Sequence, residues 1–121
     1  MEIQSVLQNG TTVAVVSGQE VVLSDVTSAL DLLVTALYET HSNAIIIPKE
    51  CICADFFDLS TRIAGEILQK IVTYRMKMAI VGDFSKNITP SLRAFIAECN
   101  RGNDIFFLPD VQTATDRLCR E

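Results

Sequence analysis

Three short runs along the chain are apolar at every position, and each has the length of a strand. They span residues 44–47, 78–81 and 105–108, and the first of them is ended by Pro48. A strand without a polar position has both of its faces covered, as happens in the centre of a sheet that carries helices. The pattern therefore predicts three buried strands.

The first part of the chain shows a different pattern, which predicts a hairpin. Residues 2–8 read as a short strand that ends at an Asn-Gly pair, the strongest two-residue hairpin signal. Residues 11–16 return as a β-branched strand, and residues 21–23 are expected to extend the edge of the sheet. Two antiparallel strands thus precede the buried ones.

Four further segments carry apolar residues three and four positions apart, which is the spacing of one helical face. The first begins after Asp25, a residue type that caps helix amino termini, and the second is expected over about 58–74. The third runs over 90–102 from a proline that suits a helix start, and the fourth covers 111–118. The apolar positions of the first two helices are Val26, Leu30, Leu33 and Leu37, and Leu59, Ile63, Ile67, Ile71 and Tyr74.

The order of elements is therefore β-β-α-β-α-β-α-β-α, which predicts an α/β fold. Strands and helices that alternate after a hairpin require right-handed crossovers and a mixed, mostly parallel sheet with an antiparallel edge strand. With 121 residues the chain is long enough for one core and short for two, so we expect a single domain over residues 1–121. Ile46, Ile67, Ile80 and Phe106 are predicted to lie in its core.

Composition and charge exclude several classes of function. The formal net charge is −5 and no cluster of Lys or Arg offsets it, so nucleic-acid binding is not expected. The longest apolar run is far too short to span a bilayer, and residues 1–10 lack the pattern of a signal peptide. We therefore expect a cytoplasmic protein without membrane contact. A hydrophobic fraction of 49% means either that the core is well filled or that part of the apolar material covers a partner surface, which includes a homo-oligomer.

The four cysteines are expected to be free thiols, because the chain is rich in core residues and is not expected to be secreted. Cys51 and Cys53 form a lone C-x-C after a strand. A zinc site needs about four ligands at recognisable spacings, and His41 is the only histidine. The short motifs of phosphate, nucleotide and zinc-hydrolase sites do not occur. We expect no metal site and no cofactor.

Polar residues follow the predicted parallel strands at their carboxyl ends, where ligands usually bind in sheets of this kind. Lys49 follows the first apolar run, and Asp83 and Ser85 follow the second. These residues form a candidate strand-end ligand site, with Lys49 as a cation and Asp83 as an acid. Loops are also polar simply because water solvates them, and this explanation stays open.

A second candidate site lies at the predicted start of the second helix, where Asp58, Ser60 and Thr61 occur together. Such side chains accept hydrogen bonds from the free N–H groups of a helix amino terminus. We therefore expect Ser60 at or within the first turn of this helix, with its hydroxyl near backbone N–H groups. Capping alone would explain the residue types, and the alternative is a site of partner interaction or phosphorylation.

Four stretches resemble a small bacterial family known only as a domain of unknown function: SDVTSALDLL, DFFDLST-x-x-AGEILQK, AIVGDFS and SLR-x-FI-x-x-CNRGN. More distantly, the topology is similar to the STAS domain of anti-sigma-factor antagonists. That family carries F-x-D-S-S-G at the start of its second helix, and a partner kinase phosphorylates the second serine. Phe56, Asp58 and Ser60 match this motif, whereas Leu59 and Thr61 replace its first serine and its glycine.

Two functions of different classes follow. The first is a non-enzymatic, STAS-like regulatory module that presents the second helix and the preceding loop to a protein partner. A phosphate on Ser60 would add about −1.5 to −2 charge beside Asp55 and Asp58. The second is a small-ligand binding protein, or an enzyme, that uses Lys49 and Asp83 at the strand ends. A deep pocket at the strand ends favours the second function, and a flat apolar helix face favours the first.

Overall fold

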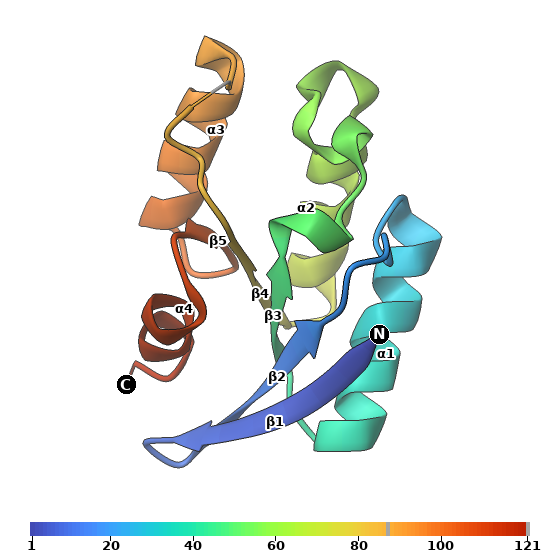
Figure 1. The fold of residues 1–121 in the computed structure, drawn as a ribbon, viewed down its shortest axis with the longest axis vertical. Coiled ribbons are helices and arrows are strands. Elements are labelled where there is room, and N and C mark those ends of the chain that lie inside the picture. The colour runs from blue at the N-terminus through green and yellow to red at the C-terminus, as the bar shows by residue number, and fades with distance from the viewer. Residues whose placement is uncertain (87, 121) are drawn as a thin grey trace.

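A computed structural model describes residues 1–86 and 88–120 of the chain. Within them, five strands form one sheet in the order β1-β2-β3-β4-β5, so that strands adjacent in sequence are adjacent in space (Figure 1). β1 and β2 pair antiparallel, and the other neighbours pair parallel. The predicted α/β fold with a mixed, mostly parallel sheet is confirmed. The strands are Glu2–Gln8 (β1), Thr11–Ser17 (β2), Ala44–Pro48 (β3), Lys77–Val81 (β4) and Ile105–Leu108 (β5).

The predicted hairpin is closed by a two-residue turn. Asn9 and Gly10 have φ angles of 52° and 78°, the left-handed values that a type I′ turn requires at both central positions. The register between β1 and β2 is continuous from Glu2 opposite Ser17 to the residues that flank the turn. The twist of this turn matches the twist of the two strands, which explains why the Asn-Gly signal was reliable.

Residues 21–23 do not extend the sheet edge, contrary to the prediction. The backbone N–H groups of Val22 and Leu23 both donate to the carbonyl of Cys51, and the N–H of Cys53 donates to the carbonyl of Leu23. The segment therefore pairs with the chain that follows β3, where Leu23 forms an isolated parallel bridge with Ile52. Its apolar residues serve this contact and not the edge.

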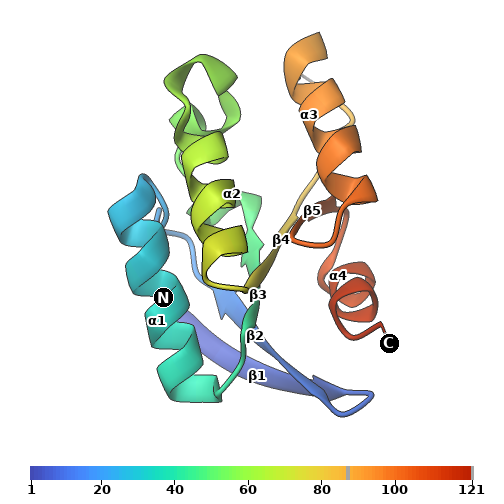
Figure 2. The ribbon, with the colours of Figure 1, turned by 180° about the vertical axis from the view of Figure 1, so that it is seen from behind.

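In the described residues four α-helices follow the predicted order: Val26–Thr40 (α1), Ile63–Thr73 (α2), Pro90–Arg101 (α3) and Val111–Leu118 (α4). Residues of α1, α2 and α3 contribute to the core on one face of the sheet, and α4 covers the other face. Figure 2 shows α1 and α2 side by side on their face. Right-handed crossovers between successive neighbouring strands place their helices on the same face, as observed. No helix in the described part of the chain is both long and apolar enough to cross a membrane.

The core contains the residues that the apolar runs indicated. Ile46, Ile67, Ile80 and Phe106 are all at most 2% exposed, which confirms the prediction. Leu37 and Tyr74, which the spacing places on the apolar faces of the first two helices, are 48% and 57% exposed, so these faces extend beyond the core. Tyr74 follows the last residue of α2 as its C-cap.

The second helix begins later than predicted. The expected range was 58–74, but α2 starts at Ile63, because Arg62 has a φ angle of 66° and a left-handed residue interrupts a right-handed helix. The preceding chain forms three short 3₁₀ turns instead. Residues three apart share a side of a 3₁₀ turn, and the four-residue step from Leu59 to Ile63 spans the break, so the apolar spacing alone did not reveal it. The turns are Lys49–Cys51 (η1), Ala54–Phe57 (η2) and Leu59–Thr61 (η3).

Candidate functional site

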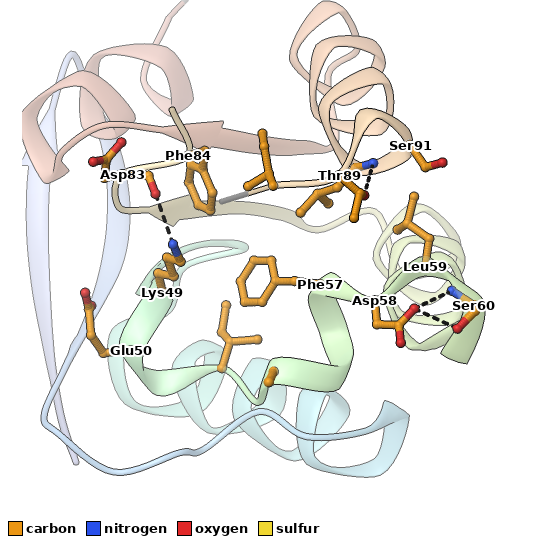
Figure 3. Close-up of a pocket in the computed structure, with 14 residues that line it drawn as sticks. Lys49, Glu50, Phe57, Asp58, Leu59, Ser60, Asp83, Phe84, Thr89 and Ser91 are labelled. Atoms are coloured by element: carbon orange, nitrogen blue, oxygen red, sulfur yellow. Dashed lines mark hydrogen bonds between the residues drawn. The ribbon is translucent and has the colours of Figure 1, made fainter. Parts of the chain in front are cut away.

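A cleft of about 880 Å³ lies at the carboxyl ends of β3 and β4, between the η1–η3 turns and the start of α3 (Figure 3). Both walls project past the same end of the sheet (Figure 1). This is the place where open α/β sheets usually bind their ligands. The apolar lining consists of Ile52, Ala54, Phe57, Leu59, Phe84, Ile88 and Leu92.

The two candidate sites from the sequence meet in this one cleft. Lys49 and Asp83 of the strand-end site line it, and so do Asp58 and Ser60 of the helix-start site. Figure 3 shows Lys49 and Asp83 at one end of the cleft and Asp58 and Ser60 at the other. The cleft is therefore polar at both ends and apolar between them.

Lys49 is held in place across the end of β4. Its ammonium group donates a hydrogen bond to the carbonyl of Asp83 at 3.0 Å and lies 5.3 Å from the centre of the Phe84 ring, in cation–π range. Gly82 makes this approach possible, since a Cβ atom there would lie 2.8 Å from the Cβ of Lys49. The position of the lysine thus depends on the glycine that follows β4.

Two turns of the same kind, each with the sequence Asp-x-Ser, flank the cleft at 58–60 and 83–85. Oδ1 of Asp58 accepts a hydrogen bond from the Ser60 hydroxyl at 2.6 Å and another from the Ser60 backbone N–H at 3.0 Å. Oδ1 of Asp83 likewise accepts hydrogen bonds from the Ser85 hydroxyl at 2.5 Å and from the Ser85 backbone N–H at 2.9 Å. The hydrogen bond from the serine hydroxyl has the largest effect and the bond from the backbone N–H the next largest. Together they lower the pKa of both carboxyl groups from the ordinary value. Both carboxylates are therefore ionised at neutral pH.

Ser60 is not the cap of α2, contrary to the prediction. It lies in η3, ahead of the left-handed residue, and its hydroxyl donates to Asp58. Thr61 does not line the cleft: its hydroxyl donates to the carbonyls of Asp55 and Asp58 at 2.7 and 2.8 Å and accepts from the Ile63 N–H at 3.4 Å. The hydroxyl groups organise the turns before the helix. Ser85 likewise stays outside the lining and orients Asp83.

The second wall of the cleft is the first turn of α3. Thr89 is its N-cap and accepts the backbone N–H of Leu92 at 3.1 Å, and Pro90 occupies the first helical position. Thr89 and Ser91 lie at the same end of the cleft as Asp58 and Ser60 (Figure 3). The start of α3 therefore contributes two hydroxyl side chains to that end.

The apolar middle of the cleft was missed by the sequence reasoning. The Phe57 ring points into it, 6.1 Å from the ring of Phe84 (Figure 3). Phe56, which the distant family resemblance singled out, is fully buried and packs edge-on against Phe57 at 5.1 Å. Adjacent phenylalanines with one side chain in the core and one in the cleft leave no periodic pattern, and the Phe-Phe pair itself was the only signal.

The cysteines take no part in the cleft. All four are free thiols, and burial raises the pKa of Cys99 to about 11, so this thiol is not a nucleophile at neutral pH. Within residues 1–86 and 88–120, His, Cys, Asp and Glu side chains form no group of three that could hold a metal ion.

A family model described as "Domain of unknown function (DUF4180)" matches residues 8–118. The chain belongs to this family. The predicted membership, over nearly the whole chain, is confirmed. No curated protein and no solved structure matches the chain, so the likeness to the STAS domain stays a prediction.

Proposed function

We propose that this domain is a non-enzymatic binding module, and that its cleft holds a ligand with an apolar body and a cationic head. The observation that carries the proposal is the pair of ionised carboxylates, Asp58 and Asp83, at the two ends of one apolar cleft (Figure 3). A volume of about 880 Å³ lies within the range of small-molecule sites. The ligand is an organic amine or the basic side chain of a larger partner.

The charge of the lining favours a cation. Glu50, Asp58 and Asp83 bring three carboxylates, whereas Lys49 brings the single ammonium group among the described lining residues. That ammonium already contacts a carbonyl and the Phe84 ring. The net charge of −5 on the chain adds a long-range attraction for cations.

The rings in the cleft suit both parts of such a ligand. The edges of Phe57 and Phe84 provide apolar contact for an aliphatic or aromatic body. The face of an aromatic ring attracts an ammonium or guanidinium group, and Phe57 offers this contact to a ligand as Phe84 does to Lys49. A neutral apolar ligand would use the rings and gain nothing from the negative charges of the two carboxylates.

The state of the carboxylates supports binding over acid–base catalysis. A general acid or base is most effective when its pKa lies near the working pH. The serine hydroxyls of residues 60 and 85 instead lower the pKa of Asp58 and Asp83, away from neutrality. The two groups offer a permanent negative charge and not a proton.

The test is a titration of ¹⁵N-labelled protein with hexylammonium and, separately, with hexanoate of equal chain length. Hexylammonium should shift the amide signals of Phe57 and Phe84, and hexanoate should bind clearly more weakly. Asp58→Asn and Asp83→Asn should each weaken the binding of hexylammonium several-fold. Asp31→Asn, which removes an exposed carboxylate of α1, is the matched control and should leave it unchanged. Equal binding of the two probes would refute the cationic head.

A second candidate is a regulatory module that binds a protein partner and is switched at Ser60. This serine is exposed at the cleft, and no helix depends on it as a cap. A phosphate there would add about −1.5 to −2 charge beside Asp58. Exposed apolar side chains on the α1–α2 face also support a protein partner. They are Val34, Leu37, Tyr38, Val72 and Tyr74.

The switch is tested with a partner isolated by pull-down from the native host. Ser60→Asp should change the affinity of this partner while circular dichroism shows an intact fold. Ser17→Asp, the same change at an exposed serine of β2, should have no effect. Equal affinities of the partner for wild type and Ser60→Asp would refute the proposed switch at Ser60.

The proposed setting is the bacterial cytoplasm. Four free cysteines in a small domain support a reducing compartment, where thiols persist. The acidic balance of the chain supports a ligand other than nucleic acid.

A further inference from the structure

The two edge strands of the sheet, β1 and β5, differ in how their outward backbone groups are protected. The β5 edge is short, and the side chain of Asn100 on α3 covers it: its amide accepts the backbone N–H of Phe107 at 2.8 Å and donates to the carbonyl of the same residue at 3.1 Å. The amide thus replaces a neighbouring strand. Native proteins protect exposed edges by such means because unpaired backbone groups recruit other chains.

The β1 edge has none of these protections. The strand is seven residues long, and its sequence, EIQSVLQ, contains no Lys, Pro or Gly. Its register with β2 has no bulge, and no other strand of the described chain pairs with its outer side. Leu7 is 72% exposed and Val6 is 36% exposed. A long, regular and partly apolar edge of this kind is a surface for strand pairing.

The hairpin determines which backbone groups face outward. In a two-residue hairpin, the residues that flank the turn form a hydrogen-bonded pair, and bonded and non-bonded pairs alternate from there. In the observed register Gln8 lies opposite Thr11, so this rule makes Gln8, Val6 and Gln4 the residues that are bonded to β2. The N–H and C=O groups of the residues between them, Ser5 and Leu7, therefore point away from the sheet, and those of Ile3 follow the same rule.

We propose that β1 pairs antiparallel with β1 of a second copy of this chain, about a two-fold axis at Ser5. The outward groups of residues 3, 5 and 7 are symmetric about this point, so both copies present the same pattern to each other. Ser5 then faces Ser5 of the second copy, and Ile3 faces Leu7. About six hydrogen bonds join the strands in this register.

The side chains in this register favour a second copy. The exposed Leu7 packs against Ile3 across the strands, and such apolar pairs stabilise antiparallel sheets. Glu2 is the only charged side chain of the strand, and it faces Gln8 of the second copy. The like charges of the two Glu2 residues therefore lie at opposite ends of the paired strands. The two sheets become one continuous sheet.

The test uses charge at the two-fold axis. Wild type should sediment at twice the chain mass of 13.3 kDa in the micromolar range. Ser5→Lys and Ser5→Glu each place like charges opposite each other and should sediment as monomers. An equimolar mixture of the two variants pairs opposite charges and should recover the dimer mass. Ser17→Lys, the same change on β2, should stay dimeric, and circular dichroism should show that all variants are folded.

Amide hydrogen exchange gives an independent readout with an internal control. The N–H groups of Ser5 and Leu7 should be protected in the wild-type dimer and exchange rapidly in Ser5→Lys. The N–H group of Val6, which is bonded within the hairpin, should stay protected in both. A monomeric wild type, or a dimer that survives both charge variants, would overturn the proposal. Failure of the mixture to recover the dimer would also overturn it.

Discussion

Replacing Phe56 by alanine should remove the anchor of the wall that carries the cleft. The side chain is fully buried, packs edge-on against Phe57 at 5.1 Å and lies 6.4 Å from the ring of Phe107. Buried Phe→Ala changes cost about 3–5 kcal/mol of unfolding free energy. Aromatic pairs add about 0.5–1.5 kcal/mol beyond the buried area, so we expect a loss in the upper part of that range. This is a large share of the roughly 5–15 kcal/mol that stabilises a typical domain.

The assay is equilibrium unfolding in urea followed by circular dichroism, with the free energy taken by linear extrapolation. Phe57→Ala is the matched control, because the neighbouring ring is only half-buried and lies in the cleft. It should cost clearly less stability but weaken the binding of hexylammonium. If Phe56→Ala does not fold, Phe56→Leu should show a smaller loss in the same direction. A loss below about 1 kcal/mol for Phe56→Ala would refute the placement of this ring in the core.

Two further predictions concern the polar ends of the cleft. Gly82→Ala should displace Lys49 and lower the free energy of unfolding in urea by about 1–3 kcal/mol. The reason is that the new Cβ meets the Cβ of the lysine and not the flexible end of its side chain. Unchanged stability together with unchanged NMR signals of Lys49 would contradict this. Ser60→Ala should raise the pKa of Asp58 toward its ordinary value, as measured by a carboxyl NMR titration. The folded-state pKa of Asp58 lies below the unfolded value, so its stabilising effect is present above the unfolded pKa and is lost as the pH falls through the folded pKa. The variant should therefore lose less stability on acidification, and an identical acid profile would show that the hydroxyl does not control this carboxylate.

Much of the architecture was predictable because buried elements and tight turns require particular residue types at particular positions. Strands with both faces covered must be apolar throughout, and the Asn-Gly pair supplies the positive φ angles of the turn. The meeting of Lys49 and Asp83 also followed, since neighbouring parallel strands end at the same edge. These features depend on local chemistry and on the order of the elements alone.

The start of α2 was not predictable by the same means. Arg62 has a left-handed conformation that arginine rarely adopts, so its residue type gives no indication of the break. The apolar spacing runs on through Leu59 and Ile63, so periodicity places both in one helix. Phe57 and Phe84 escaped notice for a related reason: single apolar residues in loops have no period, and only the folded chain brings them together.

The Asn100 side chain that covers the β5 edge has a mechanical consequence for the cleft. The side-chain amide of Asn100 is bonded to both backbone groups of Phe107, and Arg117 of α4 donates to the backbone carbonyl of Asn100. These bonds tie α3 to the sheet and to the opposite layer. The facing wall consists of three isolated 3₁₀ turns that are joined by extended residues. One wall of the cleft is thus bonded directly to the sheet edge and to α4, whereas the other is held through the buried Phe56 ring and through the backbone bonds between residues 22–23 and 51–53.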